Sequence, residues 1–227
     1  MSELEIEPQK LLAGNVWDTT RELSKLHNLS TLVLHKVEAK ETRLPFWNDY
    51  YIFPIYHVYA PATSQDEVDF ITSVEDKDFL TKEEWLEFKE GRPVVILKGI
   101  IGVHRTSGAI VHTRDLMPSR YLFNAQNFAF DEPDLIICKT PMEVMILLQS
   151  DEFECFPNIV ATMHDTIMPA QEMWILRYAK GRVATVNLQV EEETLRPPGA
   201  NFTVQHHEIR LDSSLSKHNL KALHYLL

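Results

Sequence analysis

The sequence predicts an α/β fold, with a parallel βαβαβ sheet in its second half and a small mixed α+β part before it. Three short apolar runs carry this prediction, at residues 134–138, 158–163 and 183–186. The two segments between them carry helix start signals. Strands that alternate with helices form parallel sheets, in which ligands bind beyond the carboxyl ends of the strands.

The mixed N-terminal part is expected to span residues 1–133. Thr19 and Glu22 resemble a capping box and predict a helix over about residues 20–27. The apolar run at 32–37 predicts a strand. Residues 43–60 are rich in aromatic and β-branched side chains and predict another strand. Aromatic side chains in such a segment either stack on nucleic-acid bases or pack in a core, and the core is the commoner case.

Charge is distributed unevenly along this part. Residues 61–90 hold ten Asp and Glu against three Lys, a net charge of −7, whereas residues 92–127 hold five Lys and Arg against one Asp, a net of +4. The acidic stretch, about 61–91, includes a predicted helix from Thr81 and is interpreted as an insertion. It forms a solvated face, a docking surface for a basic partner or a nucleic-acid mimic, and the sequence does not choose among these. The basic island indicates either phosphate contacts or unrelated surface charges.

The elements that follow are each marked by local signals. Two β-rich runs around residues 106–108 predict a hairpin. Thr140, Pro141 and Glu143 combine a cap, a first-turn proline and a capping box, and predict a helix. Pro169 opens a second helix, which Gly181 is expected to close. A strand over 202–209 and a C-terminal helix from about 214 complete the prediction.

Bulk properties exclude several classes of protein. The chain has 227 residues, 44% hydrophobic content and a net charge of −11, which argues against indiscriminate nucleic-acid binding. No nucleotide-binding glycine motif, zinc-ligand spacing, signal peptide or membrane-spanning run is present, so we expect a cytoplasmic protein without a cofactor or a membrane partner. Cys138 and Cys155 are interpreted as reduced, buried thiols.

The second half resembles the Toprim fold, the metal-binding catalytic core of bacterial-type DNA primases, topoisomerases and related nucleases. The resemblance lies in Asn158-Ile-Val-Ala-Thr-Met163, which is similar to the second strand of the family, and in Gln171 on the following helix. Where the family carries Glu-Gly after its first strand, this chain has Lys139 and Thr140, with Glu143 a turn later. Where the family carries Asp-x-Asp after its third strand, this chain has Asn187 and Gln189.

The first half resembles the RNA-polymerase core of bacterial and phage DNA primases. Residues 48–55 are similar to a strand of that core but lack its arginines. Residues 99–105, which end in Arg105, and residues 118–124, which include Arg120 and Tyr121, follow in the order of the family. The resemblance implies that this patch contacts a template strand and nucleotide phosphates. Arginines that pair with carboxylates of the chain itself are the alternative.

The replaced residues bear directly on catalysis. Divalent cations such as magnesium bind through carboxylate oxygens. Relative to the family pattern, Lys139, Asn187 and Gln189 make the local charge more positive by four units. A lysine ammonium repels a cation, so a two-metal phosphoryl-transfer mechanism is not expected.

The sequence therefore predicts a catalytically inactive, degenerate Toprim domain over 134–227 that acts as a binding or accessory factor in nucleic-acid transactions, with a viral (bacteriophage) setting in replication or transcription. Its expected partner is single-stranded DNA or RNA, or a replication or transcription protein. Two alternatives stay open, an active primase or nuclease that uses displaced carboxylates such as Glu143 or Asp165, and a structural subunit of a larger assembly. No metal site is expected. The predicted nucleic-acid contacts are Lys98, Arg105, Arg114, Arg120, Tyr121 and Lys139, and the degenerate Toprim positions are Lys139, Glu143, Asn187 and Gln189.

Overall fold

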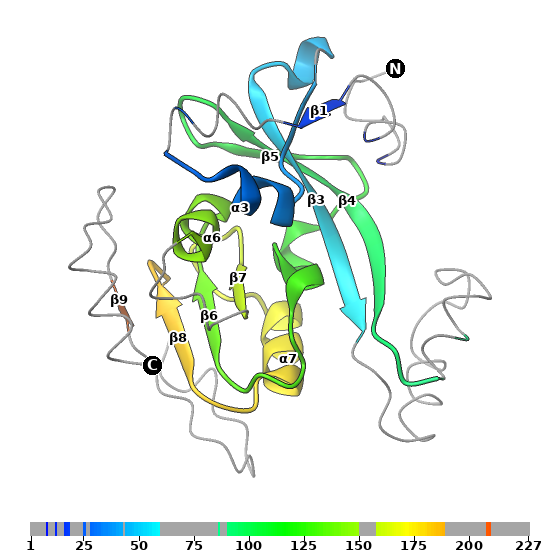
Figure 1. Cartoon of the computed structure of the whole chain (residues 1–227), viewed down its shortest axis with the longest axis vertical. Coiled ribbons are helices and arrows are strands. Elements are labelled where there is room, and N and C mark those ends of the chain that lie inside the picture. The colour runs from blue at the N-terminus through cyan, green and yellow to red at the C-terminus, as the bar shows by residue number, and fades with distance from the viewer. Residues whose placement is uncertain are drawn as a thin grey trace.

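The computed structural model describes residues 16–18, 28–42, 44–59, 90–149, 158–188 and 208–209, and the single residues 8, 12, 25 and 86. Figure 1 shows two sheets, an antiparallel one in the upper part of the view and a parallel one below it. The predicted α/β class, with a mixed first part and a parallel sheet in the second half, is confirmed.

The first sheet has five antiparallel strands in the order in which they follow along the chain. A short 3-10 helix, η2, at Pro45–Trp47 precedes its long third strand. The strands are β1 (Val16–Asp18), β2 (Lys40–Thr42), β3 (Tyr50–Tyr59), β4 (Val94–His104) and β5 (Ile110–His112). The aromatic strand is therefore confirmed over Tyr50–Tyr59, whereas residues 45–47 of the predicted segment form the 3-10 helix instead. The hairpin around residues 106–108 is confirmed.

The pairing of β3 with β4 contains a β-bulge at Lys98. The register passes from Ile55–Gly99 to Tyr56–Leu97, so Lys98 is the extra residue on β4. A bulge bends the strand and changes the direction of its side chains. Beyond it, Gly99 lets β4 approach the segment after β5, because a Cβ there would lie 2.7 Å from Cβ of Leu116.

The prediction of a strand over residues 32–37 is wrong, because this segment forms the helix α3 (Thr31–Lys36). Ser30 caps it, with Oγ accepting a hydrogen bond from the Val33 N–H at 3.2 Å. The buried residues include Val33 and Leu34, whereas Leu32 is 78% exposed. Burial at helical spacing, rather than the alternation of a strand, decides the conformation of this short apolar run.

The second sheet contains the three predicted parallel strands, β6 (Leu135–Cys138), β7 (Ile159–Ala161) and β8 (Val183–Val186). Its order is β7-β6-β8-β9, where β9 (Glu208–Ile209) pairs parallel with β8. Helix α6 (Pro141–Leu148) follows β6 and helix α7 (Pro169–Tyr178) follows β7. The elements predicted at the centre of the chain are therefore confirmed.

Both faces of the parallel sheet are buried. One face, which includes Ile136 and Val186, packs on α6 and α3 and on inward residues of the first sheet such as Phe53. The other face, which includes Ile137, packs on α7 and on a segment that holds Leu122. In Figure 1 the arrowhead of β8 points toward α3 and the antiparallel sheet. The carboxyl ends of the parallel strands thus lie in the part of the molecule where the two sheets meet.

Gly181 does not end α7 as predicted. The last residue of the helix is Tyr178, and Gly181 is not among the residues with positive φ. The main-chain N–H of Gly181 donates to the Pro133 carbonyl at 2.8 Å, and a Cβ at position 181 would lie 2.8 Å from Cβ of Pro133. A glycine is needed here for close packing of two chain segments.

Several predicted elements lie outside the described residues. They are most of the helix at 20–27, the acidic stretch, most of the strand at 202–209 and the C-terminal helix. The division into domains at residues 133 and 134 stays a prediction. No helix in the described part of the chain is long and apolar enough to cross a membrane.

Candidate functional site

The carboxyl end of β6 leads directly into the first turn of α6, where Glu143 closes a capping box. Thr140 Oγ1 accepts from the Glu143 N–H at 3.3 Å. In return, Glu143 Oε2 accepts from the N–H groups of Thr140 at 2.8 Å and Lys139 at 2.9 Å. One carboxylate oxygen thus satisfies two main-chain donors at the start of the helix.

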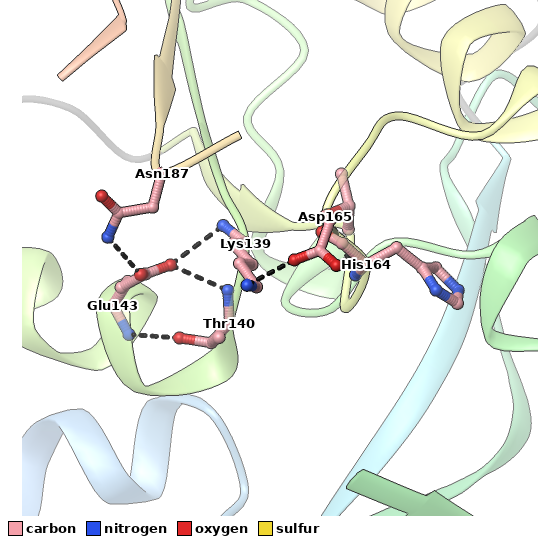
Figure 2. A network of polar contacts seen from close by, with 7 residues as sticks. Lys139, Thr140, Glu143, His164, Asp165 and Asn187 are labelled. Atoms are coloured by element: carbon pink, nitrogen blue, oxygen red, sulfur yellow. Dashed lines mark hydrogen bonds and ion pairs between the residues drawn. The ribbon is translucent and has the colours of Figure 1, made fainter. Parts of the chain in front are cut away.

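The other oxygen of Glu143 reaches the end of β8. Asn187 Nδ2 donates to Glu143 Oε1 at 2.6 Å, as Figure 2 shows. Asn187 has φ +55°, in the left-handed region that asparagine tolerates better than most residues. The strand end therefore turns in a way that places the amide on the carboxylate.

Lys139 reaches in the other direction, toward the loop after β7. Its Nζ forms an ion pair with Asp165 Oδ1 (Figure 2). The Lys139 side chain is 40% exposed and the Asp165 side chain 71% exposed. The hydrogen bond and the charge of Lys139 lower the pKa of the Asp165 carboxyl below its ordinary value.

The end of β7 is held by main-chain and side-chain hydrogen bonds. The N–H groups of Thr162 and Met163 donate to the carbonyls of Cys138 at 3.0 Å and Lys139 at 2.9 Å, which continues the pairing with β6. Met163 has φ +64°, an unusual conformation for a bulky side chain. Gln171, fully buried on α7, donates through Nε2 to the Thr162 carbonyl at 2.9 Å.

His164 follows directly and points away from the Lys139 contacts in Figure 2. Its Nε2 is buried and has no hydrogen-bond partner within the described part of the structure. Burial lowers the pKa of His164, opposed by the Asp165 charge and assisted by His112. His164 is therefore neutral near pH 7.

Cys138, the last residue of β6, lies under this network. It is a free, fully buried thiol. Burial, and then the Glu143 charge, raises its pKa well above the ordinary value. A thiol of this kind is a poor nucleophile. Cys155 lies outside the described residues.

The residues at the positions predicted to be degenerate do not fit a divalent cation. Both oxygens of Glu143 already accept hydrogen bonds, and the Lys139 ammonium lies between Glu143 and Asp165 in Figure 2. A cation there would have to displace these contacts and tolerate the adjacent positive charge. Within the described residues, no three His, Cys, Asp or Glu side chains come together in a way that could hold a metal ion. Gln189 lies outside the described residues.

The predicted basic contacts are not gathered in one place. Arg105 follows the His104 end of β4, where it lies 3.5 Å from a Glu41 oxygen and 5.0 Å from the ring centroid of Tyr51. Lys98 is half-buried in the bulge, and Arg114 is exposed after β5. Arg105 thus pairs with a carboxylate of the chain itself, which was the alternative to a phosphate contact.

Arg120 has a different environment. It lies in a 3-10 helix, η4 (Pro118–Arg120), where its main-chain N–H donates to the Met117 carbonyl at 2.9 Å. Its side chain is exposed, and within the described residues its guanidinium has no hydrogen bond or ion pair. It borders a small pocket that is also lined by aromatic side chains, among them His57, Tyr121 and Trp174. The rings of His57 and Tyr121 meet edge to face at a centroid distance of 5.7 Å.

Gln171 connects this pocket to the strand ends. Besides Thr162, its Nε2 lies 3.1 Å from the Pro118 carbonyl and 2.7 Å from the Tyr121 carbonyl. Two residues of the pocket, His57 and Trp174, were not among the contacts predicted from the sequence. His57 belongs to the aromatic segment 43–60, which was the only indication in the sequence that it could take part in a binding surface. It is half-buried, whereas most residues of the strand are buried in the core. No sequence pattern near Trp174 predicted that its side chain would line this pocket, because its position depends on how α7 packs.

Comparison with known proteins identifies the fold. No protein-family model and no curated protein sequence matches this chain. Among solved structures, the primase domains of bacteriophage T7, in a structure with the lagging-strand DNA polymerase, an RNA/DNA hybrid and dTTP, are similar with a TM-score of 0.53 and 8% identity over 93% of this chain and 77% of that one.

Two further solved structures are similar at lower scores. The DnaG catalytic core has a TM-score of 0.49 and 13% identity over 91% of this chain and 69% of that one. The zinc-binding and RNA-polymerase domains of Aquifex aeolicus primase have a TM-score of 0.47 and 15% identity over 92% of this chain and 55% of that one. At these identities the similarity concerns the fold alone. The fold assignment rests on the T7 primase domains, and it supports the predicted resemblance to a primase Toprim core.

Proposed function

We propose that this chain is a catalytically inactive, primase-like binding factor that contacts single-stranded nucleic acid around Arg120. The observation that carries the proposal is the environment of Arg120, an exposed guanidinium without a partner in the described residues, next to the rings of His57 and Tyr121. Binding of single strands without sequence preference typically combines phosphate-binding cations with aromatic side chains that stack on bases.

The strand ends support the absence of catalysis. Lys139 and Glu143 are engaged with Asp165 and Asn187, so they offer neither a free cation for phosphate nor a free carboxylate for metal. Lys139 therefore ranks below Arg120 as a nucleic-acid contact. The similar T7 primase domains were solved with an RNA/DNA hybrid and dTTP, which supports a nucleic-acid partner and a bacteriophage replication setting in the cytoplasm of a host.

The test is fluorescence anisotropy with a labelled single-stranded oligonucleotide, DNA and RNA in turn, across a salt series. Arg120→Ala is expected to weaken binding about tenfold, equivalent to roughly 1.4 kcal/mol. It should also reduce the slope of log affinity against log salt by about 1, because one phosphate contact is lost. The control is Arg92→Ala, since Arg92 is also exposed but already pairs with Glu90 at 2.8 Å.

Two results would overturn the proposal. If Arg120→Ala binds as tightly as wild type, or if binding does not weaken with salt, the proposed nucleic-acid interface is wrong. If the wild-type chain synthesises primers on a template with Mg²⁺ or Mn²⁺, the proposed inactivity is wrong. We expect no product with either ion.

A further inference from the structure

Lys139 and Asn187, which stand where the Toprim pattern has carboxylates, lie at the ends of β6 and β8, and polar contacts join these two ends to each other and to the loop after β7. We infer that Lys139, Glu143, Asp165 and Asn187 form a metal-independent clasp that holds these strand ends together in place of a bridging ion. The inference is independent of the proposed nucleic-acid binding, since none of the four residues lines the pocket beside Arg120.

The first half of the clasp joins β6 to β8. Glu143 accepts two main-chain N–H groups at the end of β6 through one oxygen and the Asn187 amide at 2.6 Å through the other. The Asn187–Glu143 bond connects residues 44 positions apart in the chain. Hydrogen bonds to an ionised acceptor are shorter and stronger than neutral ones. The carboxylate thus serves as an internal bridge and needs no cation to bring the strands together.

The second half joins β6 to the loop after β7. The Lys139 ammonium supplies a covalently attached positive charge, and Asp165 receives it. Both side chains are partly exposed, so this contact is weaker than the first and is screened by salt. The same two segments are also joined by main-chain hydrogen bonds, from Thr162 and Met163 to the carbonyls of Cys138 and Lys139.

The charges of these groups favour a network that needs no ion. Carboxylates gathered at one site repel each other and need either protonation or a cation. Here Glu143 faces an amide and Asp165 faces an ammonium, so these two carboxylates do not meet each other. The left-handed conformation of Asn187 and Met163 falls at two of the strand ends. Such conformations persist where surrounding contacts over-determine them.

Thermal unfolding of the full chain tests the clasp. The wild-type midpoint should be the same in EDTA, Mg²⁺ and Mn²⁺, because an ion that bound only the folded state would raise it. Asn187→Gly keeps the left-handed backbone while removing the amide, and should lower the midpoint by about 3–10 °C. The matched control is Asn28→Gly, at an exposed asparagine with φ +52°, which should have a smaller effect.

The contributions of the two halves of the clasp to stability can be distinguished by their dependence on salt. Lys139→Met should lower the midpoint in low salt, and the difference from wild type should shrink in about 1 M NaCl, where the screening length is about 3 Å. Lys180→Met, at an exposed lysine after α7, is the control and should have little effect in either condition. The Asn187→Gly loss should persist in high salt, since it concerns an amide.

A further variant probes the repulsion directly. Asn187→Asp places a second carboxylate against Glu143 and should destabilise the chain more at pH 8 than at pH 5, where the two groups share a proton. The inference is overturned if Mn²⁺ raises the wild-type midpoint, if Asn187→Gly matches Asn28→Gly, or if Asn187→Asp is as stable as wild type at pH 8. None of these results affects the Arg120 binding assay, so the two proposals fail separately.

Discussion

Gln171 is the buried side chain on which the arrangement of the pocket and the end of β7 depends. It has no exposed surface, and its amide satisfies groups from three segments. Nε2 lies 2.7–3.1 Å from the carbonyls of Pro118, Tyr121 and Thr162, and Oε1 accepts from the Met168 N–H at 3.1 Å. We predict that Gln171→Met, which keeps the size and removes the polar atoms, destabilises the chain strongly.

The magnitude follows from the number of bonds. An amide nitrogen has two hydrogens, so three acceptors share two donors, and with Oε1 the side chain makes three full hydrogen bonds. At about 0.5–1.5 kcal/mol each, with buried main-chain groups left unsatisfied afterwards, the expected loss is about 3 kcal/mol. For a chain of 150–250 residues this corresponds to a fall in the unfolding midpoint of roughly 6–12 °C.

The chain supplies its own control in Gln126. Both amide atoms of Gln126 are buried, and neither has a hydrogen-bond partner in the described part of the structure. Gln126→Met therefore removes a desolvation cost without breaking a bond, and is expected to change stability by less than about 1 kcal/mol or to increase it.

Urea denaturation of the two variants and of wild type measures both effects. Gln171→Met should also weaken oligonucleotide binding, because Gln171 holds the main chain on both sides of Arg120. The reasoning is refuted if the two substitutions cost the same, since the difference between them is the number of hydrogen bonds each amide makes.

Two further predictions concern packing and pH. Gly102→Ala should cost about 1–3 kcal/mol in urea denaturation, because the added methyl would lie 2.9 Å from Trp47 Cζ3; an unchanged midpoint would mean that the indole moves aside easily. Because burial lowers the pKa of His164 from its ordinary value of 6.5, the unfolded chain binds more protons below that pH, so this residue makes stability fall as pH drops from about 7 to 5. His164→Gln should flatten this dependence, measured by urea midpoints across the range, and an unaltered slope would contradict the assignment. Asp165, with its pKa lowered, titrates below this window.

Local signals in the sequence were sufficient for the centre of the fold. A cap at Thr140, a proline at position 141 and a glutamate at the third helical position predicted the start of α6, and the structure contains that capping box. These signals act within a few residues, so no distant part of the chain is needed to interpret them. The 32–37 segment has only the Ser30 cap, without a first-turn proline or a capping-box glutamate, and its apolar residues pack against the core at helical spacing.

For the candidate site, too, the sequence predicts some features and leaves others to the tertiary structure. Because parallel strands end at one edge of their sheet, the order of strands and helices along the chain is enough to place Lys139 and Asn187 near each other. It does not reveal that Asn187 bonds to Glu143, that Lys139 pairs with Asp165, or that Arg105 faces Glu41.

The sequence by itself therefore determined the order of the central elements and which polar residues stand at the strand ends, because both follow from residue identity and short-range geometry. Only the tertiary structure decided which charged groups are engaged and that Arg120 remains exposed beside aromatic rings. Those pairings join residues tens of positions apart, and their geometry exists only after the two sheets and α7 have packed together.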